Sequence, residues 1–233
     1  MRGPWLRWGR GLALGVGGLT LSMGSHAQLG VSVAADSDYR FRGVSLSDSR
    51  PSLRMTLNVD APDGWYAGAS ATRAALTQRD HYTQWLGYAG WATRAVEGRS
   101  LEFGASVSHF SGSSSYDFAE AYAGLLAERW SARVYFAPDY FGRHVQTSYA
   151  ELNAHLPLNE HARLFGHVGL LAVLRGGIDD AGKSRVDLRA GAGLALRDWD
   201  LQVAWVAASR GGPYPAVYGG RRAAWVAGAA YSF

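Results

Sequence analysis

A histidine and a serine stand one residue apart in the segment SHFSGSSS, as His109 and Ser111. A serine hydroxyl becomes a nucleophile when a nearby histidine accepts its proton, and a carboxylate usually orients that histidine. The carboxylate considered for this role is Glu120, on the following segment. If both segments are extended, His109 and Ser111 point to one face of a sheet and Glu120 points to the other. The pair therefore outlines a hydrolase, but a polar strand end that enters a serine-rich loop is the simpler interpretation.

A second candidate is the arginine pair Arg40 and Arg42 in the segment YRFRG, where Tyr39 and Phe41 alternate with them. In an extended strand both guanidinium groups share one face, because side chains repeat with a period of two. If that face lines a water-filled lumen, the two cations form a constriction for anions. Alternatively, they pair with carboxylates of the same lumen and brace the structure. The sequence leaves both alternatives open.

Both candidates depend on extended segments, and alternation with a period of two runs through most of the chain after residue 28. In the segment 130–140, for example, Val134 and Phe136 share one face, whereas Arg133 and Tyr135 share the other. No segment has a convincing helical period. We therefore predict about twelve strands. Their expected bounds are 29–41, 51–59, 65–74, 81–94, 100–110, 117–127, 130–140, 146–156, 162–174, 184–196, 199–209 and 222–233.

The lengths of these strands and of their connections favour a membrane barrel over a soluble β-sandwich. Ordinary strands have about five or six residues, whereas a tilted membrane-spanning strand needs about nine to eleven. The turns at 128–129 and 197–198 are short, and the connections at 42–50 and 210–221 are long. This alternation predicts a closed antiparallel transmembrane β-barrel with short periplasmic turns and longer extracellular loops.

Aromatic residues gather at the expected strand ends, as in the girdles of membrane barrels. The girdle at the periplasmic level consists of Trp65, Trp130, Trp199, Tyr231 and Phe233. Near the opposite rim we expect Tyr39, Phe41, Tyr140 and Trp225 to face lipid. The last strand must pair with the first, because an open sheet edge is not stable in hydrocarbon. Phe233 should therefore lie outward in the closing seam, and it resembles the C-terminal signal that the barrel assembly machinery recognises.

The same alternation predicts a lumen of mixed charge. The expected pore-lining residues are Arg40, Arg42, Arg54, Glu102, Glu120, Arg133, Asp139, Glu151, Asp187 and Arg189. The two signs nearly cancel, and long arginine side chains narrow a barrel of this size. Because Arg40 and Arg42 stand near the outer mouth, we expect a mild preference for anions.

Composition and the N-terminus bound the other possibilities. Cysteine is absent, which excludes disulfides, zinc–thiolate sites and thiol nucleophiles. Residues 1–27 have the basic start, short apolar core and small-residue end of a cleaved secretory signal peptide, which leaves 28–233 as the barrel domain. Removal of three arginines lowers the formal charge from +4 to 4 − 3 = +1, so the charge does not indicate nucleic-acid binding. We expect no cofactor and no metal.

The chain resembles the TorF-like outer-membrane porins of Gram-negative bacteria over most of 29–233. The most specific pieces are Tyr39–Gly43 and Pro138–Gly142, which read YRFRG and PDYFG. The segment HYTQWLGY departs from the family, because His81 and Thr83 stand where the family tends to carry acids. The resemblance implies a barrel and passive transport, without a named substrate.

These observations predict an outer-membrane channel, exported by its signal peptide, that lets small polar solutes diffuse according to size and lumen charge. Its expected partners are membrane lipid, lipopolysaccharide at an arginine-rich outer rim, the assembly machinery and the solutes themselves. One alternative is a hydrolase of lipid A, because His109 and Ser111 resemble the His-x-Ser site of outer-membrane lipid A deacylases. The other is a structural barrel with a plugged lumen.

Overall fold

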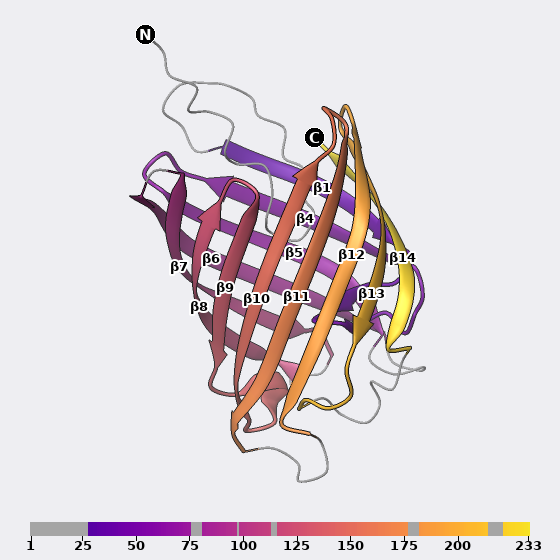
Figure 1. The fold of residues 1–233 in the computed structure, drawn as a ribbon. Coiled ribbons are helices and arrows are strands. Elements are labelled where there is room, and N and C mark those ends of the chain that lie inside the picture. The colour runs from indigo at the N-terminus through magenta and orange to yellow at the C-terminus, as the bar shows by residue number, and fades with distance from the viewer. Residues whose placement is uncertain (1–27, 76–80, 97, 113–115, 177–181, 214–220) are drawn as a thin grey trace.

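The computed structural model describes residues 28–75, 81–96, 98–112, 116–176, 182–213 and 221–233, and the predicted signal peptide lies outside them. In these ranges the chain forms twelve wall strands (Figure 1). They are β1 (Gln28–Asp36), β4 (Ser52–Asp60), β5 (Trp65–Ala75), β6 (His81–Val96), β7 (Arg99–Phe110), β8 (Phe118–Ala127), β9 (Trp130–Ala137), β10 (Gln146–Pro157), β11 (Ala162–Arg175), β12 (Ser184–Leu196), β13 (Trp199–Ala208) and β14 (Ala223–Ser232). No helix in the described part of the chain is long and apolar enough to span a membrane.

Each strand pairs antiparallel with its neighbours along the chain, and β1 pairs with β14 to close the barrel. In this seam Ser32 lies opposite Ser232 and Val33 lies opposite Tyr231. The amide of Phe233 also donates a hydrogen bond of 3.0 Å to the carbonyl of Val31. The prediction of a closed, antiparallel barrel of twelve strands is confirmed, and its seam continues to the last residue of the chain.

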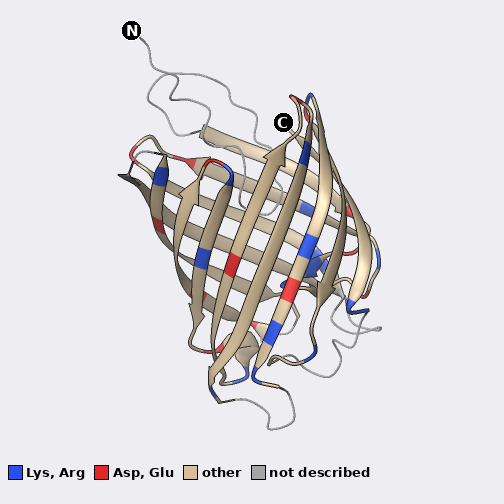
Figure 2. Ribbon diagram, viewed as in Figure 1, with Lys and Arg blue, Asp and Glu red and all other residues tan. Residues whose placement is uncertain are grey.

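The alternation along the strands separates an apolar outer face from a polar inner face. On β9, the outward Val134 is 53% exposed, whereas Glu102, which points inward from β7, is 1% exposed. The face of β6, which the sequence leaves ambiguous, is also settled. Trp85 points outward, 52% exposed, and its neighbour Gln84 is buried in the lumen. Figure 2 shows charges of both signs on strands along the height of the wall as well as at its ends.

The girdle of Trp65, Trp130, Trp199, Tyr231 and Phe233 lies at the strand ends on the side of the short turns. Trp65, Trp199 and Phe233 are 59%, 49% and 62% exposed, and Trp130 and Tyr231 are partly exposed. The ring of Tyr231 packs edge-on against Trp199 and Phe233, with centroids 5.1 and 4.9 Å apart. At the opposite rim, Trp225 is 71% exposed and faces outward as expected.

The first strand ends at Asp36, although alternation continues beyond it. The chain then turns inward and forms a small hairpin of β2 (Arg40–Phe41) and β3 (Val44–Ser45). Arg42 (φ 48°) and Gly43 (φ 73°) make its two-residue turn, with the positive φ angles that tight hairpins favour. The alternation of YRFRG therefore belongs to a hairpin inside a loop, and not to the barrel wall.

Part of the aromatic girdle expected at the opposite rim, on the side of the longer connections, is consequently wrong. Tyr39 and Tyr140 do not face lipid, because they are only 4% and 0% exposed, and Phe41 is partly buried against the same cluster. β9 ends at Ala137, and Tyr140 begins the short 3-10 turn η2 (Tyr140–Gly142). The apolar rings gain more by packing together inside the lumen than by extending the strands.

These rings belong to an apolar cluster within the barrel, on the side of the longer connections. Its members, here called the outer cluster, are Tyr39, Val44, Leu46, Ala74, Phe110, Phe118, Ala137, Tyr140, Phe141, Tyr149 and Leu171. They come from β3, β5, β7, β8, β9, η2, β10, β11 and the chain around β2 and β3. The outer half of the lumen is therefore packed like a protein core over much of its cross-section.

Candidate functional site

The connection between β1 and β4, residues 37–51, folds into the lumen and is here called the inward loop. Its contacts reach strands far from its own. The hydroxyl of Tyr39 donates to Oε1 of Gln84 on β6 at 3.0 Å. The two terminal nitrogens of Arg42 donate to the two carboxylate oxygens of Glu120 on β8, at 2.8 and 2.7 Å.

The tip of the inward loop rests on the far wall. A Cβ atom at Gly43 would lie only 2.7 Å from the Cβ atoms of both Asp187 on β12 and Ala208 on β13. Only glycine allows this approach at a positive φ. Because the loop contacts β6, β8, β12 and β13, it crosses the lumen and narrows its outer half.

Arg42 is enclosed by this arrangement. Its guanidinium carbon lies 4.1 Å from the ring centroid of Tyr149 and 5.1 Å from that of Tyr135. Burial by itself lowers the pKa of Arg42, but the Glu120 carboxylate, Tyr140 and Tyr149 together outweigh it and raise that pKa well above the ordinary value. The pair is therefore a permanent, two-pronged ion pair with aromatic faces around the cation.

The other arginine of the pair is also engaged. Nε of Arg40 donates to Oδ2 of Asp38 at 2.6 Å, and the hydroxyls of Ser45 and Ser47 donate to Oδ1 of the same carboxylate at 2.5 and 3.2 Å. Of the two roles that the sequence leaves open for Arg40 and Arg42, the structure therefore shows pairing with carboxylates. The expected mild anion preference stays a prediction.

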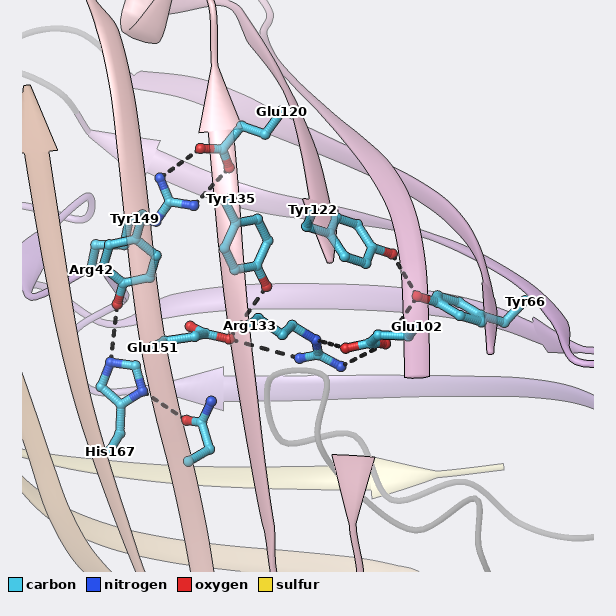
Figure 3. Close-up of polar contacts among 11 residues, drawn as sticks. Arg42, Tyr66, Glu102, Glu120, Tyr122, Arg133, Tyr135, Tyr149, Glu151 and His167 are labelled. Carbon is cyan, nitrogen blue, oxygen red and sulfur yellow. Dashed lines mark hydrogen bonds and ion pairs between the residues drawn. The ribbon is translucent and has the colours of Figure 1, made fainter. Parts of the chain in front are cut away.

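A second ionic network lies closer to the short turns (Figure 3). Arg133 on β9 stands between two carboxylates: its Nε donates to Oε1 of Glu102, and its Nη1 lies 3.7 Å from Oε1 of Glu151. The hydroxyls of Tyr66 and Tyr135 donate to Glu102 at 3.0 Å and to Glu151 at 3.3 Å. Two acids thus share one cation, and tyrosine hydroxyls complete their hydrogen bonding.

A third group joins β10, β11 and β12. Nε2 of His167 lies 2.9 Å from Oδ1 of Asp187 and 3.1 Å from the hydroxyl of Tyr149. Its Nδ1 lies 2.7 Å from the side-chain oxygen of Asn153. Asp187 is 4% exposed. The sequence analysis placed Asp187 on the lumen face but missed His167. The alternation of β11 could have identified it, because His167 shares a face with Arg163 and Phe165.

Three arginines occupy the inner face of β4, β11 and β12. Arg54 pairs with Asp36 at 3.3 Å, and Arg163 pairs with Asp200 at 2.8 Å. Arg189 donates through Nη2 to the side-chain oxygen of Gln202 at 2.8 Å. Among the described atoms, Nε of Arg54 and Nε of Arg189 have no hydrogen-bond partner. Arg163 and Asp200 were absent from the predicted lining set, although Arg163 alternates with apolar neighbours on β11.

Asp139 has a different place from the one expected. It lies beyond the end of β9, its side chain is 45% exposed, and Oδ1 accepts a hydrogen bond of 2.6 Å from the amide of His144. It therefore shapes the connection after β9 and does not stand on a wall strand.

A family model and several solved structures match this chain. The sequence matches a family model over residues 22–229. The chain belongs to this family, described as bacterial protein of unknown function (Gcw_chp). The family description does not carry the TorF-like name, which stays a prediction. A search of curated proteins found no match.

Solved barrels resemble the structure closely in fold and weakly in sequence. The KdgM porin superposes with a TM-score of 0.57 at 12% identity, over 88% of this chain and 99% of KdgM. The NanC porin gives 0.58 at 10% identity, with the same coverage. LpxR from Salmonella typhimurium gives 0.48 at 8% identity, over 88% of this chain and 99% of LpxR. At these identities the likeness to KdgM and NanC establishes the fold alone.

The remaining candidate, His109 with Ser111, does not form a nucleophile and base in the structure. Nδ1 of His109 lies 2.6 Å from Oδ2 of Asp117, a carboxylate that sequence reasoning overlooked in favour of Glu120. The hydroxyl of Ser111 instead donates to the carbonyl of Thr83 at 3.2 Å and accepts from the Thr83 amide at 3.1 Å. The serine thus links β6 to the end of β7, and Glu120 points into the lumen as its parity predicts.

Proposed function

We propose that this chain is an outer-membrane channel through which small polar solutes diffuse passively, selected by size and by lumen charge. The observation that carries the proposal is the sorting of the twelve-stranded barrel, with an apolar outer face around a lumen lined by charged and hydroxyl groups. A barrel that stands in lipid accounts for this inversion of a soluble protein, and a lumen lined by charged groups suits water and polar solutes. The solved neighbours named KdgM and NanC are porins, and KdgM was also solved in complex with disordered oligogalacturonate.

The partners follow from the same orientation. The C-terminal strand ends in an outward aromatic residue at the seam, which suits recognition by the barrel assembly machinery. At the rim of the longer connections, Arg210, Arg221 and Arg222 are exposed. Guanidinium groups bind phosphate in a two-pronged manner, so this rim suits the phosphates of lipopolysaccharide. We propose no hydrolytic role for His109 and Ser111, because the Ser111 hydroxyl is engaged with Thr83.

A plugged structural barrel is the second candidate, and the inward loop favours it. The loop contacts strands on opposite sides of the lumen, and the outer cluster packs around it. The two functions differ in one measurable property, which is whether ions pass through the resting barrel.

Single-channel conductance in a planar bilayer tests the proposal. The wild-type barrel should conduct weakly. The double variant Arg42→Ala/Glu120→Ala, which removes both charges of the loop contact, should conduct more. Arg50→Ala is the matched control, because Arg50 lies in the same loop with its side chain 55% exposed and paired only with the surface acid Asp48. Absence of current in all three proteins would establish the plugged barrel instead.

A further inference from the structure

Five tyrosines form a continuous arc on the inner wall of the barrel, here called the tyrosine track. They are Tyr88 on β6, Tyr66 on β5, Tyr122 on β8, Tyr135 on β9 and Tyr149 on β10. Neighbouring ring centroids are 6.3 Å apart for Tyr66 and Tyr88, 5.3 Å for Tyr122 and Tyr135, and 6.0 Å for Tyr135 and Tyr149. The hydroxyls of Tyr66 and Tyr122 lie 2.8 Å apart and join the two halves. Four of the five rings are seen in a row in Figure 3.

Glycines stand beneath the side chains of Tyr66, Tyr88, Tyr122 and Tyr149. Tyr66 is directly opposite Gly90, and Tyr88 is directly opposite Gly68. A Cβ atom at either glycine would collide with the tyrosine ring across from it. Tyr122 is likewise directly opposite Gly104 and would collide with a Cβ atom there. Tyr149 is paired with Leu171, but its hydroxyl end lies over Gly169 and would also meet an added Cβ atom. A ring that covers a glycine presents its other face toward the lumen.

Hydrogen bonds at the ring edges hold these faces in place. The hydroxyl of Tyr88 donates to the side-chain oxygen of Asn58 at 2.9 Å, and those of Tyr66 and Tyr135 donate to Glu102 and Glu151. The rings therefore lose little conformational freedom when a ligand stacks on them.

The two ends of the track differ. Tyr66, Tyr88, Tyr122 and Tyr135 are partly exposed to the lumen. Tyr149 is only 2% exposed, because the guanidinium of Arg42 covers its ring at 4.1 Å. The track thus leads from the side of the short turns to the underside of the inward loop.

We propose that the tyrosine track binds uncharged saccharides as they pass through the channel; this inference rests on the proposed function. The C–H faces of a pyranose ring are weakly positive and apolar, so they stack on the negative π faces of tyrosines. The sugar hydroxyls can meanwhile donate to Glu102 and Glu151 and accept from Arg133, which stand beside the rings (Figure 3). Because these two acids share one cation, the local charge is negative and repels acidic sugars.

Interruption of the ion current by maltohexaose, an uncharged probe, tests this assignment. Wild-type channels should show block that rises with maltohexaose concentration. In Tyr66→Ala/Tyr122→Ala the half-blocking concentration should rise about tenfold, which corresponds to the loss of stacking on two rings. Tyr122→Phe, which keeps the ring, should stay within about threefold of the wild type.

The matched control is Phe165→Ala. Phe165 is a lumen aromatic on β11 that covers Gly191 and lies 5.0 Å from the Arg189 guanidinium, outside the track. Its removal widens the lumen without touching the track, so block should persist. An equal loss of block in Phe165→Ala would show that only width matters and would overturn the proposal. Stronger block by hexagalacturonate than by maltohexaose would overturn the assignment to uncharged sugars.

The two proposals fail in different ways. Ion current that maltohexaose does not interrupt would refute the track and leave the channel intact. If no protein conducts, the channel itself fails, and calorimetric titration of maltohexaose into the detergent-solubilised barrel tests the track directly. Heat of binding that disappears in Tyr66→Ala/Tyr122→Ala would support the track, and no heat with the wild type would refute it.

Discussion

Arg42 is the residue on which the inward loop most depends. Its side chain and that of Glu120 are 6% and 4% exposed, and Arg42 donates two hydrogen bonds to the Glu120 carboxylate. Two buried charges in this geometry compensate each other. The pair therefore fixes the position of the inward loop more than it adds to the stability of the fold. Loss of one partner leaves the other charge buried and alone.

We therefore predict that Glu120→Gln lowers the free energy of unfolding by about 3 kcal/mol, the scale for breaking a buried ion pair. The double variant Arg42→Met/Glu120→Leu should lose less, because neither charge remains. Urea unfolding of the barrel in liposomes provides the measurement. A double variant that is less stable than Glu120→Gln would show that the pair adds net stability of its own.

Adjacent residues of β7 provide a test of the inside–outside assignment. Val107 is 56% exposed on the outer face, and Ser106 next to it points inward. Val107→Arg should destabilise by about 2–4 kcal/mol, the cost of arginine near the bilayer midplane, and Ser106→Arg should cost less. Unfolding in liposomes ranks the two variants, and the reverse order would invert the assignment of β7.

At the scale of the strand, glycines decide where aromatic rings can lie. On β7, Gly104 sits beneath the ring of Tyr122, whereas on β6 the outward Gly87 has nothing within 4 Å of the place where a Cβ would stand. The same residue type thus serves packing at one position and leaves space unused at the other. Neighbouring strands therefore depend on each other for the shape of the inner wall.

Gly104→Ala should accordingly destabilise by about 1–3 kcal/mol, because the added methyl group overpacks the site under Tyr122. Gly87→Ala should be neutral or slightly stabilising, since alanine restricts the unfolded chain more than glycine does. Comparison of their unfolding midpoints in urea gives the answer. Equal midpoints would mean that the ring of Tyr122 moves aside at little cost.

The strands were predictable from sequence because a membrane barrel enforces one rule on every residue of its wall. Outward positions must be apolar and inward positions may be polar, so alternation located all twelve wall strands. It failed where the rule no longer applied. Tyr39 and Tyr140 alternate in pattern, but they lie in connections, where packing against side chains from distant strands decides their position.

The same limit applies to the site. Parity placed Glu102, Glu120 and Arg133 inside the lumen, but it could not show which acid meets which base. Those pairings depend on the register between strands and on the path of the inward loop. The Asp117 partner of His109, in contrast, could have been found, because Asp117 begins the predicted strand 117–127 and its parity is opposite to that of Glu120.

At the scale of the whole molecule, the last residue completes the ring. The amide of Phe233 bonds to Val31 of β1, and its ring packs on Tyr231. Deletion of Phe233 should reduce the yield of folded barrel much more than Ser232→Ala, because Ser232 adds only a small inward hydroxyl. The fraction of heat-modifiable protein on electrophoresis measures folding. Equal yields would show that closure does not need the terminal residue.

The inward loop also has a consequence for the order in which the molecule assembles. Its first residue is held by β14, since the amide of Ser37 donates to the Ala227 carbonyl at 2.8 Å and the Ala227 amide donates to the Ser37 hydroxyl at 2.9 Å. The loop's other partners stand on β6, β8 and β12, which must already face one another before it can settle. We therefore expect the loop to dock at the same moment as the ends of the sheet meet. Closure of the barrel and narrowing of the lumen would then occur together. The assembling barrel would therefore never form a wide pore without the inward loop in it.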